Sequence, residues 1–139
     1  MGQVVEELNA NDHKFLALHR NWLDHQSAGS DIESTSEAKL HLIQTIIEGE
    51  ELKKYESTKI QSLGVGFGDA LTQDVPELEW VAVEDEDGRE LALRFKHTSI
   101  LFYPLTDLAR RIEDYVEVDV MNMFDGFKGS IYDILEDIA

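Results

Sequence analysis

The chain has 139 residues, no cysteine, and 29 acidic against 12 basic side chains, which gives a formal net charge of −17. This length suggests about one domain, so we expect a single domain over residues 1–139. The lack of cysteine excludes disulfides, a thiolate nucleophile and a thiolate metal site. Such an acidic surface repels nucleic acid and anionic membranes, and it favours a basic protein as partner.

The hydropathy pattern contains no candidate membrane segment. No apolar run approaches the roughly 18 residues that a transmembrane helix needs, and the first residues lack a basic stretch followed by an apolar one. We therefore expect a cytoplasmic protein that binds no membrane. No motif in the sequence requires a cofactor, so none is expected.

The N-terminal third is predicted to be helical after a short lead-in over residues 1–8. Asn9 or Asn11 can cap a first helix over residues 12–26. Its buried face follows helical spacing and contains Phe15, Leu16, His19, Trp22 and Leu23. Because His19 lies on this apolar face, we expect a core histidine with a hydrogen-bond partner.

A second helix is predicted to begin at a cap formed by Ser34 or Ser36 and to stop near Gly49. Its apolar stripe consists of Leu40, Ile43, Ile46 and Ile47. Ser57 or Thr58 caps a third helix, which ends before Pro76.

The third helix contains three glycines, Gly64, Gly66 and Gly68. Each glycine costs a helix about 0.5–1 kcal/mol relative to alanine, so close packing against a sheet is the expected compensation. A phosphate-binding loop is the alternative, but such a loop needs a preceding strand and a following Lys-Ser or Lys-Thr. Asp69 follows instead and would repel a phosphate.

Three antiparallel strands are predicted next, over residues 79–84, 89–95 and 99–103. Asp87-Gly88 is a strong signal for a two-residue hairpin turn with positive φ at both residues. A turn centred there pairs Trp80 with Phe95 and Ala82 with Leu93. One face of the hairpin is then apolar, and it consists of Trp80, Ala82, Leu93 and Phe95.

The C-terminal part is predicted to return to helix. Thr106 can cap a helix from Asp107 to about Asp114, and a short strand is expected near residues 115–118. A further helix starts at Asp119, and two glycines are expected to break it before a last amphipathic helix. Those glycines are Gly126 and Gly129.

The hairpin turn itself is a candidate partner-binding site because it is strongly acidic. It contains Glu84, Asp85, Glu86 and Asp87. A calcium loop is the alternative, but the EF-hand pattern would put Val83 at its first position and Arg94 at its twelfth, and both are wrong. A solvated turn that attracts a basic partner is therefore expected.

A second candidate site consists of Asp69, Arg94 and Arg111, which are expected on a helix, a strand and the following helix. A partly buried ion pair among them would be structural. A small anion or a peptide carboxylate held by Arg94 and Arg111 would be functional.

Metal and catalytic motifs are poorly represented. His13, His19 and His25 are six residues apart, which places neighbours about 120° apart around a helix, so they cannot converge on one metal ion. We expect no metal site and no catalytic residue. No nucleophile elbow occurs, and the abundance of carboxylates gives no weight to any particular catalytic pair.

Several motifs in the same order and spacing resemble the bacterial family called domain of unknown function 3806. They are Leu63 to Leu71, Glu79 to Asp85, Gly88 to Arg94, Thr98 to Ile100 with Pro104, Arg111 to Glu113 and Val118 to Val120. The resemblance covers about residues 60–125, and the region before residue 57 is similar only in being helical. It implies a bacterial origin and supports the fold, and it supplies no catalytic residue.

Together these observations predict an α+β fold, with N-terminal helices packed on a three-stranded antiparallel meander and C-terminal helices completing the core. For function, we expect a non-enzymatic protein-binding module, such as an immunity protein against a basic toxin. A binder of small anions or peptides through Arg94 and Arg111 is one alternative. A hydrolase with carboxylate catalysis is another.

Overall fold

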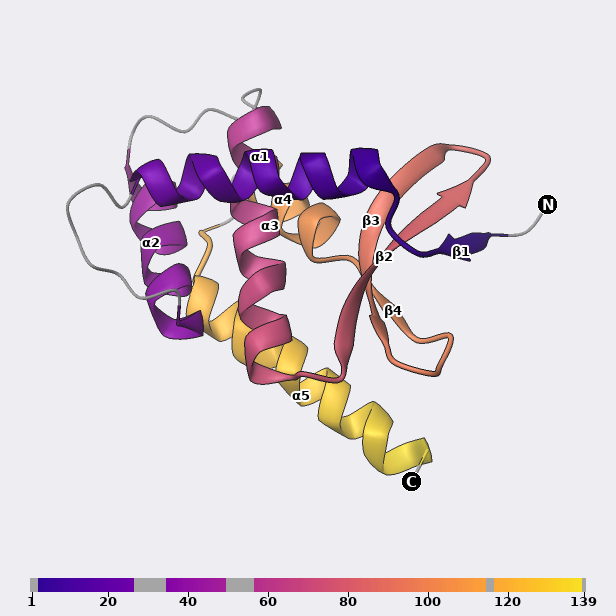
Figure 1. Cartoon of the computed structure of the whole chain (residues 1–139). Coiled ribbons are helices and arrows are strands. Elements are labelled where there is room, and N and C mark those ends of the chain that lie inside the picture. Colours follow the sequence, from indigo (N-terminus) through magenta and orange to yellow (C-terminus); the bar gives the residue numbers. More distant parts are fainter. Residues whose placement is uncertain (1–2, 27–34, 50–56, 115–116, 139) are drawn as a thin grey trace.

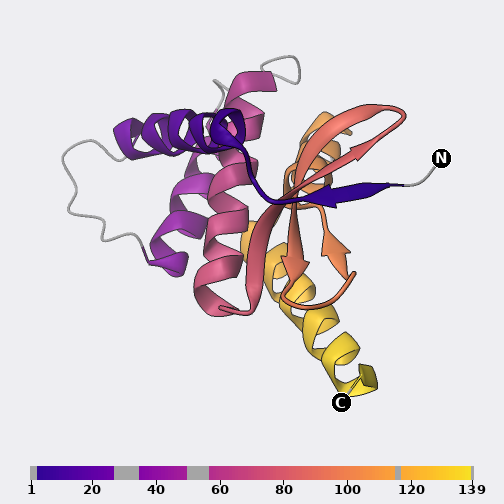
Figure 2. The same cartoon turned by 45° about the vertical axis from the view of Figure 1, so that its right-hand side comes forward.

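The computed structural model describes residues 3–26, 35–49, 57–114 and 117–138. Strands and helices follow one another in the order β1 (Val4–Glu6), α1 (Ala10–Gln26), α2 (Ser36–Glu48), α3 (Ser57–Asp74), β2 (Leu78–Asp85), β3 (Gly88–Phe95), β4 (Leu101–Phe102), α4 (Pro104–Glu113) and α5 (Val120–Ile138). Helices α1, α2 and α3 lie on one side of the sheet, and the C-terminal half of α5 extends beyond the other elements (Figures 1 and 2). The predicted α+β class is confirmed.

The helix ends follow local hydrogen bonding, and two predicted caps are wrong. At the start of α1, Asn9 Oδ1 accepts from the Asp12 N–H at 2.9 Å, and Asp12 Oδ2 accepts from the Asn9 N–H at 2.8 Å. Thr35, rather than Ser36, caps α2. Helix α4 begins at Pro104 instead of after Thr106, because proline is preorganised for the first helical position.

The C-terminal region is more helical than predicted. Helix α5 runs without a break through Gly126 and Gly129, where an added Cβ would meet nothing within 4 Å. Residues 117 and 118 form no strand, and the rest of the predicted strand lies outside the described residues. The Gln44 side chain joins α5 to α2, since it donates to the Val118 carbonyl at 2.9 Å and accepts from the Val120 N–H at 2.7 Å.

The sheet has four antiparallel strands in the order β1-β2-β3-β4, one more than predicted. The additional strand comes from the predicted lead-in, where Val5 pairs with Val83. Strand β4 is only two residues long and pairs with β3 at Leu93 and Arg94; among the described residues, the rest of that edge has no strand partner.

The hairpin turn lies one residue earlier than predicted. Asp85 pairs with Gly88, so Glu86 and Asp87 form the turn, and Trp80 pairs with Leu93 instead of Phe95. Among these residues only Gly88 has a positive φ, at 125°, so the predicted turn with two positive φ angles is wrong. The pairing moves by two residues, and the apolar face is unchanged because strand side chains alternate.

The three glycines of α3 are helical, and their lack of a Cβ brings neighbours close. A Cβ on Gly64 would lie 2.8 Å from the Leu105 Cα, and one on Gly68 would lie 2.4 Å from the Trp80 ring. On another face, a Cβ on Gly66 would lie 2.6 Å from Leu23 Cδ1. The glycines therefore let α3 approach α4, α1 and the sheet together.

The core surrounds α3. Phe67 lies edge-on to the rings of Phe124 and Phe127, with centroids 5.8 and 5.5 Å apart. His19 is 3% exposed, and its Nδ1 lies 2.6 Å from Ser62 Oγ, so the predicted core histidine is confirmed. The Ser62 hydroxyl donates to the Thr58 carbonyl, which makes Nδ1 of His19 the donor in the first bond. Burial lowers the pKa of His19.

Glycine-to-alanine substitutions test the packing of α3. We expect Gly64→Ala to lower the free energy of unfolding by about 1–3 kcal/mol, because the new methyl meets backbone that cannot rotate away. Gly126→Ala is the matched control and should raise that free energy by about 0.5–1 kcal/mol, because its methyl enters open space in a helix. Urea unfolding followed by circular dichroism measures both, and equal changes would contradict the packing role.

Candidate functional site

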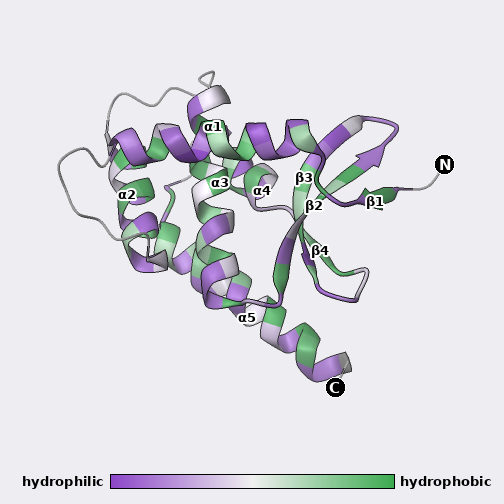
Figure 3. Ribbon diagram, viewed as in Figure 1, coloured by the Kyte–Doolittle hydropathy of each residue, from purple (hydrophilic) through white to green (hydrophobic). Residues whose placement is uncertain are grey.

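The β2–β3 hairpin presents four carboxylates in succession at its tip. Glu84, Asp85, Glu86 and Asp87 are all exposed, and Asp85 Oδ1 accepts from the Asp87 N–H at 2.8 Å, which shapes the turn. The tip extends away from the helical layer (Figure 2), and its ribbon changes from hydrophobic beside the helices to hydrophilic at the turn (Figure 3). This segment is the predicted partner-binding site.

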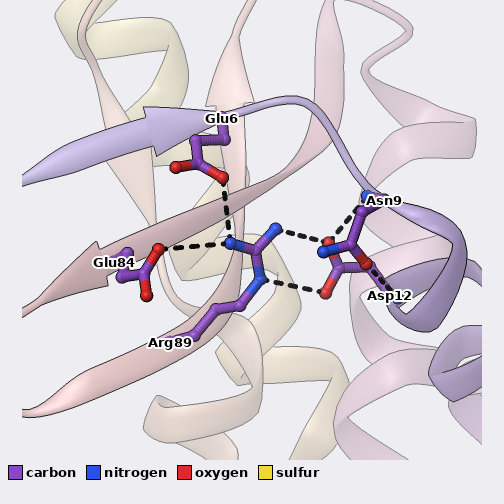
Figure 4. Close-up of polar contacts among 5 residues, drawn as sticks. All are labelled: Glu6, Asn9, Asp12, Glu84 and Arg89. Carbon is purple, nitrogen blue, oxygen red and sulfur yellow. Dashed lines mark hydrogen bonds and ion pairs between the residues drawn. The ribbon is translucent and has the colours of Figure 1, made fainter.

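Arg89 pairs with Glu84 next to the turn and holds this end of the hairpin. Its guanidinium donates to Asp12 Oδ1 at 3.2 Å and Oδ2 at 2.7 Å, and to Glu6 Oε2 at 3.0 Å. Nη1 also lies 3.5 Å from Glu84 Oε2. Figure 4 shows the Arg89 side chain reaching carboxylates on β1, α1 and β2. We call Arg89 and its three carboxylate partners, Glu6, Asp12 and Glu84, the Arg89 network.

Asp12 is the buried member of the Arg89 network, at 7% exposure. The hydrogen bonds from Arg89 lower the pKa of Asp12, although burial alone would raise it. The same carboxylates raise the pKa of Arg89, which is a cation at any physiological pH. At neutral pH this ion pair therefore fastens the N-terminus of α1 to the hairpin.

A hollow of about 430 Å³ lies beside this ion pair, between α1, α3, α4 and the start of β3. Its apolar walls are formed by Phe15, Leu91, Leu105 and Ala109. The polar residues that line it are Asn11, Asp12, Gln61, Arg89, Glu90 and Thr106.

Among the described residues, no contact joins the three members of the second predicted site to one another. Asp69 accepts two hydrogen bonds from Arg20, at 2.7 and 2.8 Å, and a third from Trp80 Nε1 at 3.0 Å. Arg94 donates twice to Glu79 Oε2, at 3.1 and 3.0 Å, across the β2–β3 pair. Asp69 and Arg94 therefore each form an ion pair with a residue outside the predicted set.

Arg111 lies in a separate, open hollow between α4 and α5, of about 1100 Å³. Arg110 lines it too, and its floor includes Phe102, Met123 and Phe127. Asp107 belongs to the same hollow, and burial raises its pKa even though both arginines act to lower it. The arginines and Asp107 give this hollow charges of both signs.

Within the described ranges, no three His, Asp or Glu side chains are placed to hold a metal ion. Over the same residues, no helix is long and apolar enough to cross a membrane.

Neither the Arg89 network nor the Arg20 partner of Asp69 was predicted from the sequence. One signal was available, since Asn9 and Asp12 have the spacing of a capping box, which places a carboxylate in the first turn of α1. No local pattern could show that Arg89, 77 residues later, neutralises that carboxylate.

The fold and the hairpin site together define a small α+β domain, with an acidic β-hairpin anchored to its N-terminal strand and helix. The chain belongs to the family described as a domain of unknown function (DUF3806), whose model matches residues 39–124. The match begins within α2, earlier than the sequence resemblance indicated.

A crystal structure from Bacteroides thetaiotaomicron VPI-5482 is similar, with a TM-score of 0.78 and 12% sequence identity. The similarity covers 90% of this chain and 47% of that one, so the chain spans about half the length of that structure. At this identity the likeness shows the fold alone. No curated protein matches the chain.

The pH dependence of stability tests the Asp12–Arg89 pair. A lowered pKa of Asp12 means that the pair stabilises the fold fully above the ordinary carboxyl value of 3.8 and loses this effect as the pH falls below it. Arg89→Gln should therefore destabilise the protein more at about pH 7 than at about pH 3.

The matched control for this measurement is Arg94→Gln, which breaks the more exposed pair with Glu79 and should cost about 0–1 kcal/mol. Urea unfolding at both pH values gives the comparison. If Arg89→Gln were as destabilising at acid pH as at neutral pH, the charge on Asp12 would not be the cause.

Proposed function

We propose that the chain is a non-enzymatic protein-binding module that uses its acidic hairpin tip to bind a basic protein. The observation that carries this proposal is the exposure of Glu84, Asp85, Glu86 and Asp87 on a hairpin that extends from the body. A net charge of −17 adds long-range attraction, which speeds the encounter with a cationic partner.

The Arg89 network supports this role because it limits the motion of the hairpin next to the turn. Three carboxylates hold Arg89, whereas the tip residues Glu86 and Asp87 are exposed to solvent. A charged surface on a braced hairpin loses less conformational entropy on binding than the same charges on an unbraced loop. An immunity protein that neutralises a basic toxin is the form of this function that best matches the size and charge of the chain.

Variants with neutralised side chains distinguish binding at the hairpin tip from the general attraction by the net charge of the protein. Glu86→Gln with Asp87→Asn removes two charges and keeps both the Asp85 turn bond and the Glu84 contact to Arg89. The control, Glu136→Gln with Asp137→Asn, makes the same change in net charge on exposed residues of α5. The probe is a synthetic polyarginine peptide, with its affinity measured by fluorescence anisotropy at about 50 and about 200 mM salt.

The tip variant should bind about twofold to thirtyfold more weakly than the control, as two exposed ion pairs of about 0.2–1 kcal/mol each require. Both affinities should fall with salt. Equal affinities of the tip variant and the control would reject the hairpin as the contact surface. For the immunity role, a basic toxin encoded beside the gene should co-purify with the wild type and be lost with the tip variant.

A second candidate function is the binding of a small anion or peptide carboxylate by Arg111. The hollow between α4 and α5 favours it through Arg110 and Arg111, which line an open space together with the carboxylates Asp107, Asp114 and Asp125. Arg94 is engaged by Glu79 and does not line this hollow, so Arg110 takes its place in the proposal. The hydrolase alternative has less support, since it calls for two carboxyls of raised pKa in one hollow and Asp107 supplies one.

A thermal-shift measurement with acetate, citrate and phosphate tests this candidate. An anion that binds the native state raises the melting temperature of the wild type, and the rise grows with the ratio of anion concentration to Kd. Arg111→Gln should abolish the shift, and Arg94→Gln should keep it. No shift at concentrations well above about 1 mM, or the same shift in both variants, would remove the candidate.

A further inference from the structure

The hollow beside the Arg89 network lies next to the hairpin tip in the chain and in space. Arg89, Glu90 and Leu91 line it, and they follow the turn directly. A protein that covers the tip therefore lies beside residues that line the hollow. Its volume of about 430 Å³ is in the range of about 300–1,000 Å³ that is common for small-ligand sites.

The charges around this hollow do not cancel. Asp12 receives hydrogen bonds from Arg89 and from the Asn9 N–H, and Arg89 is held by three carboxylates. The Asp12–Arg89 pair is thus internally neutral. Glu90 also lines the hollow, and among the described residues its carboxylate accepts a hydrogen bond from Thr106 Oγ1 at 3.2 Å and meets no cation within ion-pair distance.

The apolar walls of the hollow favour a cation that is carried on an aliphatic chain when it binds Glu90. A flexible aliphatic chain can pack against the apolar side chains of Phe15, Leu91, Leu105 and Ala109. A water molecule would form no hydrogen bond with these side chains. The amide oxygens of Asn11 and Gln61, which also line the hollow, can accept further N–H donors. A planar guanidinium presents five donors and suits such a set better than a compact, strongly hydrated ammonium.

We propose that this hollow receives one arginine side chain of the basic partner, with its stem against Phe15, Leu91 and Leu105 and its guanidinium on Glu90. The inference rests on the proposed binding of a basic protein and adds the residue by which that protein is anchored. Anchors of this kind, buried at the centre of a contact and surrounded by weaker polar pairs, dominate many protein interfaces.

Nuclear magnetic resonance titration of the full chain with acetyl-arginine-amide tests the proposal. The arginine probe should shift the backbone amides of Gln61, Leu91, Thr106 and Ala109. Acetyl-citrulline-amide, which has the same shape without the charge, should not. Glu90→Gln should weaken binding of the arginine probe about tenfold or more, because a charge-assisted bidentate contact is lost.

Two controls keep the result interpretable. Ala109→Leu fills the hollow without changing any charge and should also abolish the shifts, which covers the case in which Glu90→Gln alters the fold. The tip variant, Glu86→Gln with Asp87→Asn, should bind acetyl-arginine-amide as the wild type does, because neither residue lines the hollow.

The outcomes separate this inference from the proposed function. Shifts confined to the hairpin tip, equal binding of citrulline, or equal binding of acetyl-lysine-amide would overturn the arginine site and leave the tip as a contact surface. Arginine shifts at the hollow, combined with no effect of the tip variant on polyarginine binding, would support the site and reject the tip.

Discussion

The close approach of α3 to its neighbours is the constraint on which the rest of the structure depends. Gly64 and Gly68 lie on one helical face and admit the Leu105 backbone and the Trp80 ring at distances that no side chain would allow. One residue after Gly68, Asp69 accepts hydrogen bonds from Trp80 Nε1 and from Arg20 of α1. The same turn of helix therefore positions the sheet, α4 and α1, and the glycine cost is offset by this packing.

The Arg89 network is a second set of contacts that holds the β2–β3 hairpin in place. It lies at the opposite end of the hairpin from the ion pair between Arg94 and Glu79. It matters because the fold gives the N-terminus of α1 a buried carboxylate, Asp12, which would be costly without a cation. Arg89 provides that cation, and in doing so it ties the added strand β1 to the hairpin through Glu6. Stability and the placement of the acidic tip are thus linked through one guanidinium.

Charge in this protein is distributed unevenly. Several cations are used in contacts between elements, such as those of Arg20, Arg89 and Lys128. The hairpin tip, by contrast, presents four exposed carboxylates in a row. A hairpin end that exposes four carboxylates in a row is suited to a cationic partner, and this supports the proposed protein-binding function.

The sequence alone determined the α+β class, the three N-terminal helices, the glycine-bearing packing face and the acidic turn, because these follow from local periodicity and turn chemistry. The resemblance to the family came from the order and spacing of several motifs. The sequence could not determine the strand made by Val4–Glu6, since three residues carry no period until β2 pairs with them. It also placed Asp69, Arg94 and Arg111 together, whereas the fold gives Asp69 to Arg20 and Arg94 to Glu79. Ion pairs between distant residues depend on which side chains the packing brings within about 4 Å, and only the tertiary structure decides that.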